Sequence, residues 1–374
     1  MVTAATLTPD AMARQAAVNP TWRFGLVLGG GGMRGLAHVG VLRALEEGGW
    51  IPAEIVGTSI GSLLGAVWAT GRYTVAEMEQ ISLDLTRRDI FQIAHADMAF
   101  KRMRAPSLYR SEPLATLIHR LVGDVTFHDL ARPLIVNSVD INSGTQMFWG
   151  LPGLEDMRVA DAVFASCALP GFFSPHEIGG RFYVDGAIVD NLPVRIAAAR
   201  GMDAVVAVNV GASSLLRADT QEAGFAAVYA RGSEIVFQQA IEWHLRSWAK
   251  PPLLLVQPSV QQLPMMSFDH TRELMDEGHR ATRLALEQTG SAIHSATGGI
   301  FPRRLVQIRV TRERCIGCGA CLSYAAPGMF RMEDGKAVGP DGPCEWSPID
   351  GDVIRHCPTF AITARPVPAA SPSA

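Results

Sequence analysis

The chain has 374 residues, of which 48% are apolar and 18% charged, and its formal net charge at pH 7 is −3. This composition permits a large buried core and excludes an intrinsically disordered chain. The near balance of charge gives no reason to expect a nucleic-acid partner, which would need a concentrated basic face. At roughly 100–200 residues per domain, the length predicts two domains, or one large and one small.

The first 21 residues are polar and rich in alanine, and we expect them to form an N-terminal extension. No basic start followed by an apolar segment marks a signal peptide. No run reaches the ~18 apolar residues of a membrane span, because the most apolar stretch, 59–70, is short and broken by glycines. We therefore expect a cytoplasmic protein, with peripheral membrane contact left open.

Between residues 22 and 290, short apolar runs alternate with longer segments of helical periodicity. The nearly continuous apolar character of the short runs predicts strands buried on both faces, as in a parallel sheet. The expected strands are 24–29, 53–59, 132–140, 203–210 and 252–258, and the expected helices are 36–47, 60–70, 75–87, 111–122, 158–168, 193–200, 224–247 and 270–289. This alternation predicts a layered α/β domain.

Residues 291–304 are rich in small residues, glycine and proline, which predicts a linker. Two short apolar runs, 305–311 and 360–365, predict strands on either side of a group of cysteines. We expect a small domain over residues 305–366, followed by a disordered tail at 367–374.

A glycine-rich segment, Gly29–Gly35, follows the first expected strand and opens the first expected helix. Glycines at a helix N-terminus leave backbone N–H groups open to a negative charge. Residues 30–35 also satisfy the dinucleotide pattern G-x-G-x-x-G, but that motif expects an acidic residue at the end of the next strand. The next strand ends in Val56-Gly57-Thr58 instead, which favours an oxyanion hole.

A second motif, Gly57-Thr58-Ser59-Ile60-Gly61, lies between an expected strand and an expected helix. This is G-x-S-x-G in the context of a nucleophile elbow, where a sharp turn exposes the serine hydroxyl. The alternative is that Ser59 only caps the helix, since serine is a favoured N-cap residue. The glycine-rich segment upstream favours the nucleophile.

A serine nucleophile needs a base, and Asp185 ends a short expected strand just before Gly186. Asp-Gly pairs are also common in turns, so Asp185 on its own would be taken as a turn residue. A carboxylate can act as the base if its environment raises its pKa toward the working pH.

Together these elements resemble the patatin-like phospholipase family over about residues 24–290. The resemblance rests on GGGMRG at 30–35, GTSIG at 57–61 and DGA at 185–187, supported by ASCALPGFFSP at 165–175 and DGAIVDNLPV at 185–194. It implies a three-layer α/β/α hydrolase that cleaves acyl esters of phospholipids or related lipids through an acyl-enzyme.

The resemblance also implies a Ser–Asp dyad, with Ser59 as the nucleophile and Asp185 as the base. It implies that an oxyanion hole is formed by the backbone N–H groups of Gly30, Gly31 and Gly32. The motifs are completed by Arg34, Gly35, Gly57, Gly61 and Gly186. Arg34 occupies a position that is usually basic in the family, and we expect it to have a structural role or to support charge.

The alternative within the same class is a Ser–Asp–His triad. Its candidates, His244, His270, His279 and His294, lie in or near expected helices, and none follows a strand end. His38 lies just inside the helix that follows the glycine-rich segment. We expect all five histidines to be structural.

The C-terminal cysteines Cys315, Cys318 and Cys321 form C-x₂-C-x₂-C, and Cys357 is followed by a proline. This spacing is typical of a [4Fe–4S] cluster and resembles single-cluster bacterial ferredoxins over about residues 305–365, a small α+β domain. Four-cysteine zinc is the alternative, but zinc sites usually show two separated C-x₂-C pairs. Cys344 matches no ligand position, and we expect a free buried thiol there.

The sequence thus predicts a lipid acyl hydrolase with an appended [4Fe–4S] domain that senses redox state or exchanges electrons with a partner protein. The alternative is an electron-transfer or redox-regulatory protein whose hydrolase fold serves as a lipid-binding scaffold. The segment 87–110 mixes basic and apolar side chains, which suits either an anionic bilayer surface or a solvated lid.

Overall fold

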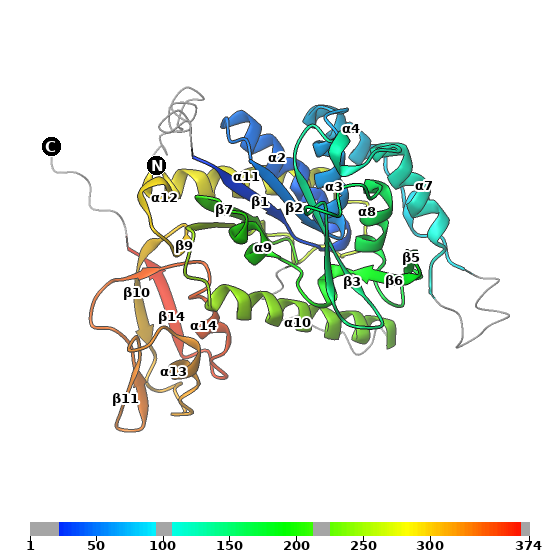
Figure 1. The fold of residues 1–374 in the computed structure, drawn as a ribbon. Coiled ribbons are helices and arrows are strands. Elements are labelled where there is room, and N and C mark those ends of the chain that lie inside the picture. The colour runs from blue at the N-terminus through cyan, green and yellow to red at the C-terminus, as the bar shows by residue number, and fades with distance from the viewer. Residues whose placement is uncertain (1–21, 95–106, 212–224, 368–374) are drawn as a thin grey trace.

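The computed structural model describes residues 22–94, 107–211 and 225–367. Its main feature is a nine-stranded mixed sheet with the order β5-β6-β3-β2-β1-β7-β8-β9, in which β4 also pairs with β3 (Figure 1). The parallel strands are β1 (Phe24–Leu28), β2 (Glu54–Thr58), β3 (Leu134–Asp140), β7 (Ala204–Val208), β8 (Leu253–Val256) and β9 (Ile300–Phe301). The antiparallel edge is formed by β4 (Gln146–Trp149), β5 (His176–Ile178) and β6 (Arg181–Asp185).

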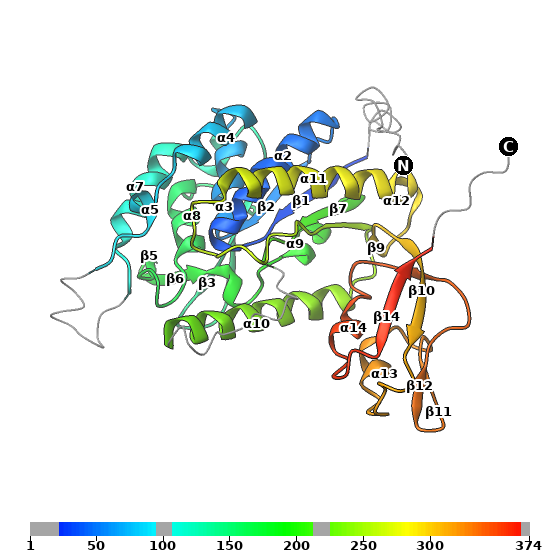
Figure 2. The same cartoon turned by 180° about the vertical axis from the view of Figure 1, so that it is seen from behind.

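Helices cover both faces of this sheet. Side chains alternate between the two faces along each strand, and the apolar side chains on both faces need to be buried. In β1, Leu26 and Leu28 enter the core beneath α2, α3, α8 and α11, whereas Val27 enters a second core beneath α9 and α10. The first group comprises α2 (Ala37–Glu47), α3 (Ile60–Ala69), α4 (Val75–Asp84), α5 (Arg87–Ile90), α7 (Ser111–Val122), α8 (Val159–Cys167) and α11 (Thr271–Thr289). The second group comprises α9 (Val194–Ala199) and α10 (Phe225–Arg246), as the reverse view shows (Figure 2). The predicted three-layer α/β/α fold is confirmed.

The long elements lie where the sequence predicts them. All five expected strands and the expected helices are present within a few residues, although 75–87 divides into α4 and the start of α5. The strands β4 and β5 have no counterpart in the prediction. The expected linker, 291–304, contains α12 (Ala292–Ser295) and also β9, which pairs with β8 in the main sheet.

The C-terminal unit has its own small core and an α+β composition. Its three-stranded antiparallel sheet has the order β13-β10-β14. The elements are β10 (Arg304–Val310), α13 (Ala320–Tyr324), β11 (Arg331–Glu333), β12 (Lys336–Val338), β13 (Cys344–Trp346), α14 (Asp352–Arg355) and β14 (Ile362–Pro366). The expected strands at 305–311 and 360–365 correspond to β10 and β14, but the resemblance to ferredoxins stays a prediction.

Three predicted features lie wholly or partly outside the described residues. They are the extension at 1–21, most of the tail at 367–374, and the centre of the basic and apolar segment at 87–110. Within the described part of the chain, none of the helices has the combined length and apolarity needed to cross a bilayer.

Candidate active site

The turn between β2 and α3 holds Ser59 in a strained backbone conformation. Its φ of 55° and ψ of −128° lie where residues other than glycine are rarely found, and such strain gathers at functional sites. A Cβ on Gly61 would collide with the carbonyl oxygen of Leu28, and a Cβ on Gly57 would lie 2.5 Å from Cα of Ser62. Both glycines are therefore required for the chain to turn this tightly, as the G-x-S-x-G motif predicts.

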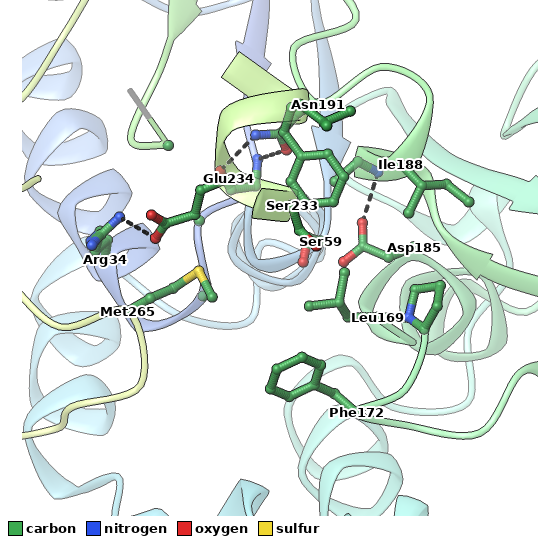
Figure 3. Close-up of a pocket in the computed structure, with 18 of the residues that line it drawn as sticks. Arg34, Ser59, Leu169, Phe172, Asp185, Ile188, Asn191, Ser233, Glu234 and Met265 are labelled. Carbon is green, nitrogen blue, oxygen red and sulfur yellow. Dashed lines mark hydrogen bonds and ion pairs between the residues drawn. The ribbon is translucent and has the colours of Figure 1, made fainter. Parts of the chain in front are cut away.

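Asp185 faces this serine from the end of β6. Its side chain is 2% exposed, and its Oδ1 accepts a hydrogen bond of 2.9 Å from the N–H of Ala187. The Ser59 hydroxyl lies near enough to this carboxyl to influence its pKa. Burial raises the pKa of this carboxyl to about 7, although the Ser59 hydroxyl and the N–H of Ala187 favour the charged form. A carboxyl with a pKa near neutrality can take a proton from serine at physiological pH. Figure 3 shows the two side chains pointing toward each other.

The glycine-rich segment lies across the opening from this pair, in the turn between β1 and the 3-10 helix η1 (Gly32–Leu36). The N–H of Gly30 donates to Oδ1 of Asn191 at 2.9 Å, so it is not free for an oxyanion. The N–H groups of Gly31 and Gly32 have no backbone or side-chain acceptor among the described residues. The expected oxyanion hole of Gly30, Gly31 and Gly32 stays a prediction, and Gly31 and Gly32 are the donors open to a ligand in this structure.

The tight packing explains why this segment consists of glycines. A Cβ on Gly30 would lie 2.5 Å from Oδ1 of Asn191 and 3.0 Å from Cβ of Ser59. Gly32 has a φ of +57°, and a Cβ there would lie 2.6 Å from the carbonyl oxygen of Met265. Any larger residue would push the loop away from the serine.

Arg34 has a structural role, as predicted. It is 1% exposed, its Nε donates to the carbonyl of Leu263 at 2.8 Å, and its Nη1 forms an ion pair of 3.2 Å with Glu234 on α10. It thereby ties the glycine segment to two other parts of the chain. Gly35 and Gly186 are also packing positions, because a Cβ on either would collide with Ile60 or with Asn137.

Two positioning residues were not singled out from the sequence. Asn191 binds both backbone groups of Gly30: its Oδ1 accepts the Gly30 N–H at 2.9 Å, and its Nδ2 donates to the Gly30 carbonyl at 3.1 Å. Ser166 is buried, accepts the N–H of Ser59 at 2.9 Å and donates to the carbonyl of Asn137 at 2.6 Å. Both lie in the runs 165–175 and 185–194, which carried the family resemblance without an assigned role.

The pair opens into a cavity of about 460 Å³ with mainly apolar walls (Figure 3). The apolar lining is contributed by Leu169, Pro170, Phe172, Ala187, Ile188, Val236, Phe237 and Met265. Polar groups gather at its base around Ser59 and Asp185 and at one side around Arg34 and Glu234. Such a cavity suits a ligand with a long apolar portion and one reactive polar group.

No histidine lines this cavity in the part of the chain that the structure describes. His244 lies 3.4 Å from Asp190, His279 lies 2.7 Å from Glu47, and His294 stacks against tryptophans. Burial lowers the pKa of His38 to about 4, so this side chain is neutral at pH 7, and its Nε2 donates to the carbonyl of Gly29 at 2.8 Å. Among the described residues, the site thus combines a serine and a carboxyl group without a histidine beside them.

The four expected cluster ligands, Cys315, Cys318, Cys321 and Cys357, all line one small pocket of about 20 Å³ in the C-terminal unit. Backbone N–H groups point at two of the sulfurs, with Ala337 lying 3.4 Å from Sγ of Cys315 and Ala361 lying 3.3 Å from Sγ of Cys357. Cys344 lies apart on β13, with its Sγ 3.8 Å from the carbonyl of Val306.

Comparison with known proteins adds the family. Residues 26–198 match the model of the family described as patatin-like phospholipase. An uncharacterized NTE family protein of Mycobacterium tuberculosis is 34% identical over 191 residues, which are 51% of this chain and 50% of that protein. Human patatin-like phospholipase domain-containing protein 6 is 33% identical over 190 residues, or 50% of this chain and 13% of that protein. The chain thus spans half or less of these relatives.

Among solved structures, VipD from Legionella pneumophila superposes with a TM-score of 0.42 at 14% identity, over 72% of this chain and 67% of its own. The family match covers β1 to α9 and contains every motif residue of the candidate active site. Residues 26–198, which contain Ser59 and Asp185, are therefore similar to the patatin-like phospholipase family.

Proposed function

We propose that this protein hydrolyses acyl esters of phospholipids or lysophospholipids with Ser59 as the nucleophile. The observation that carries the proposal is that Ser59 and Asp185, a buried carboxyl whose pKa is raised to about 7, face each other in one cavity. Two unpaired backbone N–H groups face the same opening, and the walls beyond are apolar. The relatives named as phospholipases support the lipid class.

The reaction follows from these positions. Asp185 takes the hydroxyl proton as Oγ of Ser59 attacks the ester carbonyl carbon, and the N–H groups of Gly31 and Gly32 stabilise the oxyanion. Removal of one such donor typically costs about 10²–10³ in rate. The ester C–O bond then breaks, the leaving alcohol takes the proton from Asp185, and an acyl-enzyme remains. Asp185 then takes a proton from water as the water oxygen attacks the acyl carbon. The bond between that carbon and Oγ of Ser59 breaks, Oγ takes the proton back from Asp185, and the fatty acid leaves.

The apolar walls point to the acyl chain as the part of the substrate that the cavity holds. Phe172, Ile188, Val236 and Phe237 offer only carbon surface to a ligand, so an alkyl chain gains burial there without losing hydrogen bonds. The head group would remain toward the opening.

Lipid products from vesicles incubated with the wild type and with Ser59→Ala test this proposal. We expect free fatty acid and lysolipid or glycerophosphodiester only with the wild type. Ser82→Ala is the matched control, since this buried serine on α4 donates to the carbonyl of Met78, away from the cavity. Equal product from Ser59→Ala would refute the proposal.

We further propose that Cys315, Cys318, Cys321 and Cys357 hold a [4Fe–4S] cluster, which would supply one-electron chemistry. The convergence of these four thiols on one pocket and the two N–H groups directed at sulfur support the fit. The C-x₂-C-x₂-C spacing followed by Cys357 and a proline favours a cluster over zinc, whose sites usually show two separated C-x₂-C pairs.

Iron and sulfide content of an anaerobic preparation tests the cluster. We expect about four of each per chain, lost in Cys357→Ser and kept in Cys344→Ser. Stoichiometric zinc in place of iron would refute the proposal. The predicted redox partner protein depends on the presence of this cluster.

Membrane contact through 87–110 also stays a prediction. In the described part of that segment, Phe91 packs against Tyr109, Phe173 and Phe268 and so belongs to the core. Liposome co-sedimentation of the wild type and of a variant with neutralised Arg87 and Arg88 would test whether the basic side chains of this segment bind a membrane. Equal binding by both proteins would remove this prediction.

A further inference from the structure

One helix, α10, contacts both the active-site cavity and the cysteine-bearing unit. Its central part contributes Ser233, Glu234, Val236 and Phe237 to the cavity wall. Its C-terminal part carries Glu242, which lies about 12 Å beyond Glu234 along the helix axis at 1.5 Å per residue. Figures 1 and 2 both show α10 running from beneath the main sheet to α14.

Glu242 is the centre of the contact with the C-terminal unit. Although acidic, it is 6% exposed, and its Oε1 accepts hydrogen bonds from Arg355 at 2.7 Å and from Gln238 at 2.9 Å. Its Oε2 lies 3.9 Å from Nε2 of His356 and 3.8 Å from Nη2 of Arg246. A buried carboxylate with charged partners on another segment fixes that segment more strongly than a surface ion pair does.

Aromatic stacking extends the same contact. The rings of Tyr324 and His356 are stacked with centroids 3.7 Å apart and planes 9° from parallel. The guanidinium of Arg246, from α10, lies 4.8 Å from the centroid of the Tyr324 ring. The two stacked rings thus each approach a side chain of α10, His356 approaching Glu242 and Tyr324 approaching Arg246.

These contacting residues are next to the cysteines in the sequence. Arg355 and His356 directly precede Cys357, and Tyr324 lies one helical turn after Cys321 on α13. A change in the backbone around those cysteines must therefore change the groups that hold Glu242.

The other end of α10 is fixed to the catalytic machinery. Glu234 pairs with Arg34 at 3.2 Å and with Arg231 at 3.1 Å, and Arg34 belongs to the glycine-rich segment. A displacement of α10 would shift a wall of the cavity relative to Ser59.

We propose that Glu242 is a positioning residue for the substrate cavity, through which the segments bearing Cys321 and Cys357 set the place of the α10 wall. The inference deepens the proposed hydrolase and rests on it. The cysteine-bearing unit is then a part of the substrate site, and its integrity controls acyl-chain binding.

Hydrogen–deuterium exchange of the full chain tests this without any need for activity. Glu242→Gln and Arg355→Gln each remove a charged hydrogen bond, and exchange over 233–241 is expected to rise about tenfold. Exchange over 233–241 in the double variant should not exceed that in the more affected single variant, because both substitutions remove the contact between Glu242 and Arg355. Arg331→Gln, in an exposed ion pair of the same unit, is the control.

Two further arms complete the test. Arg355→Lys keeps the positive charge, so the amides of 233–241 should keep most of their protection from exchange. This variant still allows a comparison with the wild type if a glutamine variant folds poorly. Cys357→Ser should raise exchange over 233–241, whereas Cys344→Ser should not.

Kinetics give the second readout. In Glu242→Gln, KM for a long-chain ester should rise several-fold more than KM for an acetate ester, while kcat falls less than KM rises. Exchange over 233–241 that stays within twofold of the wild type in both glutamine variants would overturn the role of Glu242. Unchanged exchange in Cys357→Ser would overturn the link to the cysteines. If the wild type hydrolyses no ester, the exchange data still decide the structural part.

Discussion

Asp185→Asn should stabilise the protein at neutral pH while removing its activity. The carboxyl has a pKa of about 7 in the folded protein against 3.8 as its ordinary value, because it is buried. Between these values the native state binds more protons than the unfolded state, so the free energy of unfolding falls as pH rises. The full difference corresponds to about 4 kcal/mol, fully developed above pH 7. Asparagine has the same shape and carries no charge, so it avoids this cost.

Urea unfolding of the wild type and of Asp185→Asn at several pH values measures the effect. The stability advantage of the variant should grow by about 2 kcal/mol between pH 5.5 and pH 8. Asp140→Asn is a control of opposite sign, because backbone hydrogen bonds from Asn142 and Ser143 lower the pKa of Asp140. That variant should lose stability at neutral pH and approach the wild type in acid. A pH-independent difference for Asp185→Asn would show that the pKa of Asp185 is not raised.

Three further predictions concern the same site. The value of kcat/KM for a soluble ester should rise about tenfold per pH unit up to about pH 7 and then level off, because Asp185 must lose its proton to act as the base; a flat profile from pH 5 to 9 would contradict this. Asn191→Ala removes the two hydrogen bonds that hold the glycine-rich segment and should slow ester hydrolysis about 10- to 100-fold. Normal rates at unchanged helix content by circular dichroism would refute its positioning role. Gly61→Ala should lower the free energy of unfolding by about 1–3 kcal/mol or more, since its Cβ would collide with the carbonyl of Leu28. Gly342→Ala should leave the free energy of unfolding nearly unchanged, because a Cβ there meets open space. Thermal unfolding of the two variants measures the difference.

The sequence predicted the layers of the main domain because its central strands are apolar without interruption. A run such as Ala204–Val208 is buried at every position, and only a strand covered on both faces has this pattern. The strands β4 and β5 have only four and three residues, most of them half-buried, which is too few for a period to be recognised. Their pairing depends on strands distant in the sequence.

The motif residues were predicted for a similar reason. The serine, its glycines and the glycine-rich segment are local, since each belongs to one turn whose geometry requires those residue types. The role of Asn191 depends on a partner 161 residues away, so no local pattern reveals it. The same contact occupies the N–H of Gly30, and the spacing of the glycines could not distinguish this donor from Gly31 and Gly32.

The buried carboxylates of α10 were also beyond sequence analysis. Glu234 and Glu242 lie on the face of the helix that turns inward, whereas charged residues are ordinarily exposed. Each is buried because an arginine from another segment reaches it. Conversely, Val236 and Trp243 are apolar but exposed. Helical periodicity therefore predicted the extent of α10 but not which face packs against the rest of the molecule.

Mass-spectrometric mapping of the adduct formed by a fluorophosphonate ester tests the central claim most directly. The account predicts a single adduct on Oγ of Ser59, absent from Ser59→Ala and formed at least about 10³-fold more slowly in Asp185→Asn. An adduct on any other residue, or equally fast labelling of Asp185→Asn, would contradict it.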